Sequence, residues 1–202
     1  MSTYSLTCVN NSQLAGSFAV FQRPPQTESA GEIMSLAWLA RPTAPDSRVT
    51  FTWSLDYNFV WSENGNIASG IVFAASQVKP ANVESQNHIQ LTQDAFGATT
   101  FVNPSASGNP GSLTIEQLQN VVPDRTSVGV GMAGAATFVI QAAPNMTAVF
   151  TPHPNYWVVF GNFEPGDVIE FEDVTGAVEV TYGGALTART AVLGLDNIIT
   201  VE

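Results

Sequence analysis

The feature that most constrains the fold is an alternation of side-chain character between Val49 and Trp61. Large apolar side chains occupy every second position, and hydroxyl, amide or acidic side chains occupy most positions between them. Since alternate side chains of a strand point to opposite faces, this pattern predicts one face on a hydrophobic core and one in solvent. The run is longer than a usual strand, so it predicts one long strand or two strands joined at a bend. The residues predicted to be buried are Phe51, Trp53, Leu55 and Phe59, and those predicted to be exposed are Thr50, Thr52 and Ser54.

A turn follows this run directly. Asn64-Gly65 is a pair that readily adopts the positive φ angles of a tight hairpin turn. The pair therefore predicts a β-hairpin whose second strand covers residues 71–75.

Short β-branched and aromatic segments, separated by turn residues, recur along the rest of the chain. They predict an all-β fold, a β-sandwich or jelly roll that is mostly antiparallel, with at most one or two short helices. The sequence leaves one such helix open at residues 115–120, as an alternative that overlaps a predicted strand and that the Val121-Val122-Pro123 segment would end early. The length of 202 residues is compatible with a single domain over residues 1–202. The other predicted strands are residues 4–9, 17–21, 34–39, 88–92, 99–102, 113–116, 136–141, 147–150, 156–160, 168–172, 178–181, 186–192 and 198–201.

The balance of charged residues limits the classes of partner that the protein is expected to bind. Six Lys and Arg residues stand against 17 Asp and Glu residues, for a formal net charge of -11. Such a surface repels phosphate backbones and anionic lipid, so nucleic acid and acidic membranes are excluded as expected partners. Proteins, neutral glycans, cations and self-association remain open.

No membrane span is expected, because no apolar run approaches the roughly 20 residues that a spanning helix needs. The start Met1-Ser2-Thr3-Tyr4 lacks the basic and apolar regions of a signal peptide. The expected location is therefore cytoplasmic, or outside the cell by a leaderless export route.

A glycine-rich motif and the single cysteine could each serve either in chemistry or in the structure. Gly129-Val130-Gly131-Met132-Ala133-Gly134 matches the dinucleotide-binding pattern, but an apolar strand rather than a helix follows it. We therefore expect no dinucleotide cofactor there, and interpret the glycines as close-packed, bulge or turn positions. Cys8 is the only cysteine, which excludes an intramolecular disulfide, and its strand position predicts a buried, unreactive thiol.

The histidines are the candidates for transition-metal binding or general-base catalysis. His88 and His153 are the only two in the chain, so a metal site would need both and a carboxylate. Nothing in the sequence brings them together. His153 stands between Pro152 and Pro154, which favours a structural role in a bend.

Calcium is the one cofactor that the sequence leaves open. The turn Glu164-Pro165-Gly166-Asp167 places two carboxylates close together, and Asp173 is a third candidate ligand. The spacing is not that of an EF-hand loop, so the alternative is an ordinary solvated face. Alternation places Glu170 and Glu172 on one side of the predicted strand, as expected for such a face.

The four tryptophans could form a stacking platform for sugars or fill the core. They are Trp38, Trp53, Trp61 and Trp157. The alternation assigns Trp53 and Trp61 to the same face as Phe51 and Phe59, which is too much aromatic surface to leave exposed. The core interpretation is therefore favoured for most of them.

Several ordered segments carry a resemblance to a known family: residues 4–12, 34–38, 51–61, 128–132 and 150–157. Together they resemble the rhizosphere-induced RhiA-like proteins of plant-associated bacteria, over residues 4 to 172. The resemblance implies a setting in host- or surface-associated bacterial life, and it implies no catalytic residue.

The function expected from the sequence is a non-enzymatic β-sandwich protein that binds or assembles, because few titratable groups are available for acid-base chemistry. One alternative is a hydrolase on a jelly-roll scaffold that uses His88 or His153 with nearby carboxylates. The other is a calcium-stabilised module that binds carbohydrate or protein.

Overall fold

The protein is built from β-strands. The structure is a computed structural model that describes residues 3–24, 32–171 and 174–202. These residues form eighteen strands and no α-helix, which confirms the all-β fold. In chain order the strands are β1 (Thr3–Asn10), β2 (Gly16–Gln22), β3 (Met34–Leu36), β4 (Leu39–Thr43), β5 (Ser47–Ser54), β6 (Tyr57–Ser62), β7 (Gln77–Pro80), β8 (His88–Gln93), β9 (Thr99–Ser105), β10 (Leu113–Gln117), β11 (Ser127–Met132), β12 (Ala135–Gln141), β13 (Met146–Phe150), β14 (Tyr156–Gly161), β15 (Val168–Ile169), β16 (Val178–Val180), β17 (Ala188–Leu193) and β18 (Ile199–Val201).

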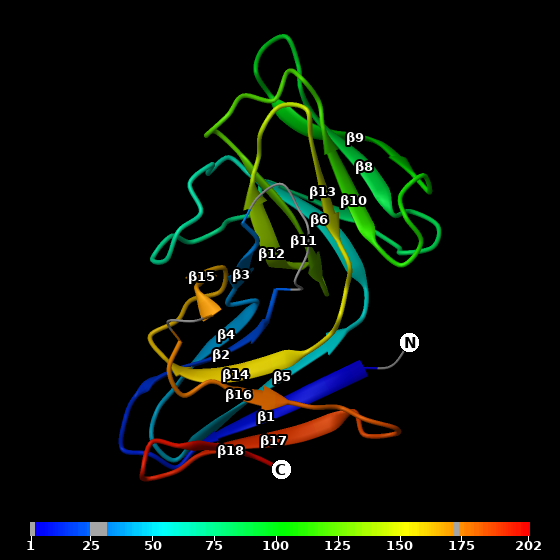
Figure 1. Ribbon diagram of the computed structural model, residues 1–202. Coiled ribbons are helices and arrows are strands. Elements are labelled where there is room, and N and C mark those ends of the chain that lie inside the picture. The colour runs from blue at the N-terminus through cyan, green and yellow to red at the C-terminus, as the bar shows by residue number, and fades with distance from the viewer. Residues whose placement is uncertain (1–2, 25–31, 172–173) are drawn as a thin grey trace.

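The half of the molecule that holds both ends of the chain is a sandwich of two four-stranded sheets (Figure 1). One sheet has the order β18-β17-β1-β5 and the other the order β16-β14-β2-β4. Their facing side chains form one core, which includes Leu6, Phe18, Phe51 and Val158. We call this half the terminal sandwich.

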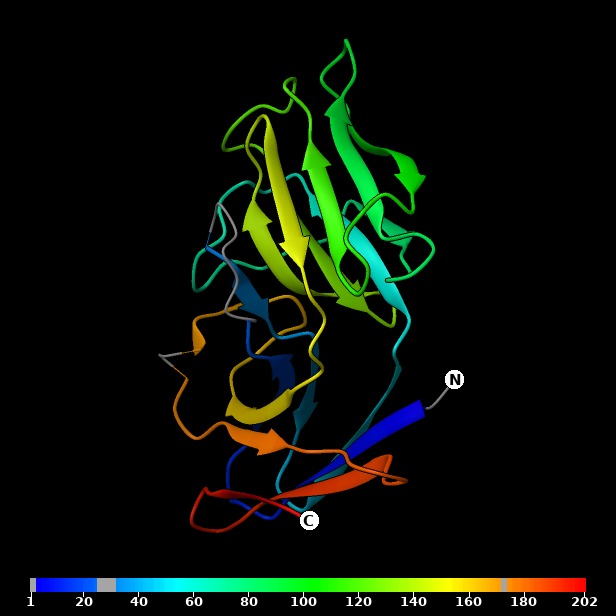
Figure 2. The same cartoon turned by 45° about the vertical axis from the view of Figure 1, so that its right-hand side comes forward.

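The other half, which we call the distal sandwich, packs a four-stranded sheet against part of a six-stranded sheet (Figure 2). The four-stranded sheet, the distal sheet, has the order β13-β10-β8-β9, and the six-stranded sheet has the order β15-β3-β12-β11-β6-β7. Their common core includes Phe59, Leu91, Ile115 and Phe138. Pairing is antiparallel throughout the assigned sheets except between β1 and β17 and between β8 and β10, so the sandwich is mostly antiparallel as predicted.

Two strands carry side chains into both halves. Val128 and Val130 of β11 lie in the distal core, whereas Met132 at the end of the same strand lies in the terminal core. The indole Nε1 of Trp38 donates to the backbone oxygen of Met132 at 3.0 Å. Tyr57, at the start of β6, packs against both cores.

The run from Val49 to Trp61 forms two strands joined at a bend, β5 and β6, which belong to different sheets. Phe51 and Trp53 are buried while Thr50 and Thr52 are exposed, as predicted. Ser54 and Leu55 are half-buried because the chain leaves one sheet for the other there. In β6 the alternation is lost and Asn58 to Trp61 are all buried, because the loop between β6 and β7 covers its outer face.

The predicted hairpin at Asn64-Gly65 is wrong. β6 pairs with β7, and the predicted strand 71–75 instead pairs with a distant segment: Phe73 N donates to Gly166 O at 2.8 Å, and Val168 N donates to Ile71 O at 2.9 Å. Gly65 has another role, because a Cβ atom there would lie 2.3 Å from the backbone carbon of Asp124.

The helix left open at residues 115–120 does not form. Residues 113–117 form β10, which pairs with β8 on one side and β13 on the other, and only a turn follows it. The predicted strand 34–39 is interrupted and forms β3 and the start of β4. β4 also contains Pro42, and it is an edge strand, where a residue without an N–H is tolerated.

Among the described residues, no helix is long and apolar enough to cross a bilayer.

Candidate functional site

The candidate site lies on the outer face of the distal sheet and continues to the end of the sheet where β10 ends and β13 begins. Inward-facing side chains such as Ile89, Leu91 and Ile115 fill the core, so the alternate positions of β8 and β10 face outward. Parallel pairing sets Glu116 of β10 beside Gln90 of β8. The strand register thus brings together polar side chains that are more than twenty residues apart in the sequence.

These outward side chains form a continuous polar network. Gln90 Nε2 donates to Glu116 Oε2 at 2.7 Å, and Asn103 Nδ2 donates to Gln90 Oε1 at 2.7 Å. His88 Nε2 lies 3.4 Å from the same Glu116 oxygen, and its Nδ1 lies 3.3 Å from the hydroxyl of Ser105. The network fixes the position of the Glu116 carboxylate on an otherwise open sheet face.

A serine–histidine–carboxylate order is present within this network. Ser105 contacts Nδ1 of His88 and Glu116 contacts Nε2, so the three side chains are linked as in serine hydrolases, but with the two ring nitrogens exchanged relative to the usual triad. The Glu116 side chain is 41% exposed, and the Ser105 hydroxyl is also bonded to Ser107 at 2.8 Å. The arrangement is therefore screened by water and not enclosed.

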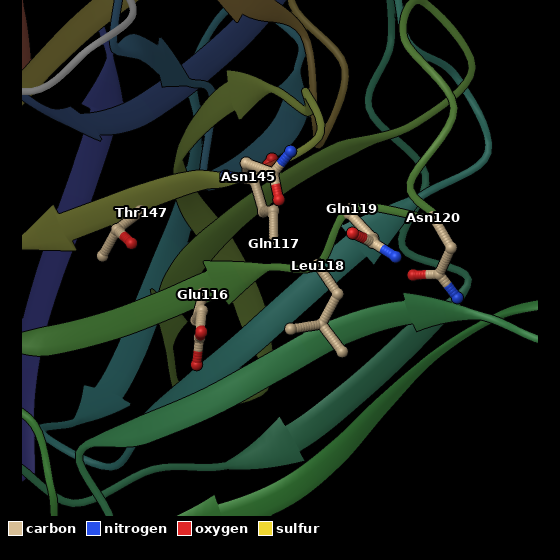
Figure 3. Close-up of a pocket in the computed structure, with 7 residues that line it drawn as sticks. All are labelled: Glu116, Gln117, Leu118, Gln119, Asn120, Asn145 and Thr147. Atoms are coloured by element: carbon tan, nitrogen blue, oxygen red, sulfur yellow. The ribbon is translucent and has the colours of Figure 1, made fainter.

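An open pocket of about 560 Å³ adjoins the network where β10 ends and β13 begins (Figure 3). In Figure 3, Glu116 extends from β10 towards β8, where it bonds to Gln90. Four of the lining side chains are carboxamides, and Glu116 is the one charged group among them. The lining residues are Glu116, Gln117, Leu118, Gln119, Asn120, Asn145 and Thr147.

Two of the carboxamides are held in place. Asn120 Nδ2 donates to Thr92 Oγ1 at 2.9 Å and to Gln93 O at 2.5 Å, at the end of β8. Gln117 is only 1% exposed, and its Oε1 accepts from Ala143 N at 2.8 Å. Gln117 Nε2 makes no hydrogen bond to any described residue. A buried donor without a partner costs about 1–3 kcal/mol, but this atom is covered by protein, so the exposed carboxamides Gln119, Asn120 and Asn145 are the ones that a ligand in the pocket would contact.

Sequence reasoning predicted the strand 113–116 but missed this pocket, because the pocket depends on the pairing of β10 with β13 and on the turn that follows β10. The detectable signal was a polar residue, Gln117, at the inward position that follows Leu113 and Ile115 in a strand pattern.

The two predicted histidines lie on different elements. His88 begins β8, and its acidic neighbour is Glu116, whereas His153 is exposed in the connection between β13 and β14. Within residues 3–24, 32–171 and 174–202, no group of three or more His, Cys, Asp and Glu side chains is placed to hold a metal ion.

The acidic turn has a local structural role. Asp167 Oδ2 accepts from Glu164 N at 2.6 Å, and Gly166 has a φ of 92°, which suits the third position of this turn. Glu170 Oε1 accepts from Ser69 N at 3.4 Å. The third calcium candidate, Asp173, lies outside the described residues, as does Glu172 of the predicted solvated face, and calcium binding here stays a prediction.

The glycine motif and the tryptophans have the structural roles favoured above. Gly129 and Gly131 lie in β11 directly against the β12 backbone, with a bulge between Val130 and Gly131, and Gly134 follows in the turn. Three tryptophans are buried in the cores, and Trp157 is half-buried. The buried tryptophans are Trp38, Trp53 and Trp61.

Comparison with known proteins extends the resemblance over the whole chain. The RhiA family model matches residues 1–202, beyond the residue 172 at which the sequence resemblance ended. The chain is 36% identical over 199 residues to a protein described as Protein RhiA from Rhizobium leguminosarum bv. viciae, covering 96% of this chain and 84% of that protein. No solved structure matches. The chain belongs to the RhiA family.

Proposed function

We propose that this protein is a non-enzymatic binding protein whose pocket at the edge of the distal sheet holds a hydroxyl-rich ligand, a neutral carbohydrate. The observation that carries the proposal is the group of three exposed carboxamides, Gln119, Asn120 and Asn145, that lines the pocket. Hydroxyl groups of a ligand would bond to these side chains.

The chemistry of the lining favours a neutral, hydroxylated ligand. Each carboxamide offers both donors and an acceptor, which complements hydroxyl groups that both donate and accept. The single charged group, Glu116, and the net charge of -11 disfavour an anionic ligand. A volume of about 560 Å³ is within the usual range for small-molecule sites.

Titration calorimetry with glucose, galactose and mannose, each free and as a short oligomer, tests the proposal. Gln119→Ala and Asn145→Gly each remove one carboxamide, and glycine tolerates the positive φ of 55° at position 145. Each should weaken binding about fivefold, the value of one hydrogen bond near 1 kcal/mol. Thr200→Ala, on an exposed position of β18, is the control. Absence of binding to every sugar, or equal affinities of all variants, would refute the proposal.

A hydrolase is the second candidate, favoured by the contacts of His88 with Ser105 and Glu116. Hydrolysis of p-nitrophenyl acetate by the purified protein tests it. A Ser105-dependent activity should be lost in both Ser105→Ala and His88→Gln and kept in Thr200→Ala. A background rate that all variants share would exclude this function.

A further inference from the structure

Phe96 is an exposed aromatic residue at the tip of the turn between β8 and β9. Its exposed fraction is 97%, the highest among the large hydrophobic residues described. Single exposed apolar residues are common on protein surfaces and need no explanation by themselves. Phe96 differs from them in the rigidity of its turn and in its position.

The turn that carries Phe96 is closed by hydrogen bonds. Asp94 Oδ1 accepts from the backbone N–H of Phe96 at 2.8 Å and of Ala98 at 2.9 Å. Asp94 N donates to Ala98 O at 3.0 Å, and Gly97 takes a φ of 84° that glycine adopts without strain. The backbone beneath the Phe96 ring is thus already ordered, which lowers the entropy lost when a ligand covers the ring.

The strand that leads into this turn is joined by hydrogen bonds to a residue of the proposed pocket. Asn120 lines the pocket and bonds to Thr92 and Gln93, the last two residues of β8. Phe96 follows Gln93 by three residues, so its Cα atom lies within roughly 11 Å of the Gln93 Cα atom. Figures 1 and 2 both show the β8–β9 turn and the segment between β10 and β11 at the same end of the molecule.

We propose that Phe96 is a stacking surface that extends this site, so that the ligand is an oligosaccharide contacting both the carboxamide pocket and the Phe96 ring. The inference rests on the proposed carbohydrate-binding function. A pyranose ring has C–H groups on one face and hydroxyls at its rim. An aromatic ring covers the C–H face by hydrophobic contact, and carboxamides bind the hydroxyls. Asp94 acts as a positioning residue for the ring.

Calorimetric titration with one monosaccharide and its oligomers of increasing length tests this extension. In the wild type, affinity should rise with oligomer length. Phe96→Ala should weaken oligomer binding about tenfold and leave monosaccharide affinity unchanged, and Phe96→Trp should restore it. Leu195→Ala is the matched control, because Leu195 is 75% exposed on the turn between β17 and β18, at the opposite end.

The outcomes separate this inference from the proposed function. If no sugar binds, the carbohydrate function falls and this extension falls with it. If sugars bind but Phe96→Ala matches the wild type, or weakens monosaccharide and oligomer equally, only the role of Phe96 is overturned. Sedimentation velocity tests whether Phe96 serves self-association instead. A wild-type dimer that Phe96→Ala makes monomeric would assign Phe96 to self-association and overturn the proposal.

Discussion

Cys8 illustrates how burial decides the chemistry of a single side chain. It lies on β1 between Val49 of β5 and Ala191 of β17, and its exposed fraction is zero. Burial raises the pKa of the thiol from about 9 to about 12. At neutral pH the thiol therefore stays protonated and is a poor nucleophile.

The first prediction is that native Cys8 reacts slowly with a thiol reagent and rapidly in denaturant. The pH dependence of stability is a second consequence of burial. Because the pKa of the Cys8 thiol is raised in the folded state, its contribution to stability is complete below the unfolded pKa near 9 and is lost as pH rises towards 12. Burial also raises the pKa of Tyr156 to about 12, so its contribution declines above pH 10. The free energy of unfolding should thus fall above pH 9. Rapid labelling at neutral pH, or constant stability up to pH 11, would contradict this.

The second prediction concerns Asp167, whose carboxylate accepts from the backbone of Glu164. Asp167→Asn keeps an acceptor oxygen and should change the free energy of unfolding by less than about 0.5 kcal/mol. Asp167→Ala removes the acceptor and should cost about 1 kcal/mol, measured by urea denaturation.

Calcium provides the contrast to this structural role. An ion bound at this turn, in excess at about 100 times its Kd, would stabilise the fold by roughly 2.7 kcal/mol. We expect the melting temperature to change little when calcium replaces EDTA. A calcium-dependent rise that Asp167→Asn abolishes would show that the turn holds an ion.

At the scale of the element, the β11–β12 hairpin depends on glycine for close approach of its two backbones. A Cβ atom at Gly129 would lie 1.9 Å from Phe138 O, and one at Gly131 would lie 1.7 Å from Ala135 O. Gly134 has open space around its missing Cβ atom but has a φ of 80°. One hairpin therefore contains two glycines that are required by steric overlap, Gly129 and Gly131, and one that is required only by its backbone conformation, Gly134.

The third prediction follows from that distinction. Gly129→Ala and Gly131→Ala should each destabilise the protein by at least about 3 kcal/mol, because strand backbone must move to admit the methyl group. Gly134→Ala should cost only about 1 kcal/mol, the penalty of a left-handed conformation. Chemical denaturation of the three variants measures the difference. Equal costs for all three would show that overlap does not dominate.

Elements with a local signal were predictable and those set by distant partners were not. The alternation from Val49 to Trp61 located both β5 and β6, but it records the buried face only in β5, because both faces of β6 are covered. Residues 71–73 pair with residues 166–168, and no local pattern encodes a partner so far along the chain. The strand predicted at residues 113–116 is confirmed as β10, whereas the alternative helix at 115–120 does not form because β10 is paired on both sides.

The candidate site was only partly predictable for the same reason. The sequence identified His88 as a candidate, but its neighbour Glu116 depends on the parallel register between β8 and β10. The Phe96 turn had a local signal that was not used: Asp94 and Gly97 flank an aromatic residue between two predicted strands.

At the scale of the whole molecule, the two sandwiches share structural elements. β6 and β11 contribute to both cores, and Trp38 of the terminal core bonds to Met132 O at the end of β11. Trp53 packs edge-on against Trp38, with ring centroids 5.4 Å apart. A disturbance at Trp53 in the terminal sandwich therefore has a direct route to the start of the distal sandwich.

The fourth prediction is that residues 1–202 unfold as one cooperative unit. Trp53 is 2% exposed, so Trp53→Ala should lower the free energy of unfolding by about 3–5 kcal/mol. If the halves are coupled, calorimetry should show one transition, and the variant should accelerate hydrogen exchange of β10 amides in the distal sheet. Leu91→Ala, at a fully buried position of the distal core, is the reciprocal variant and should accelerate exchange in β1. Two transitions, with β10 protected as in the wild type when Trp53 is replaced, would show that each sandwich is a separate folding unit.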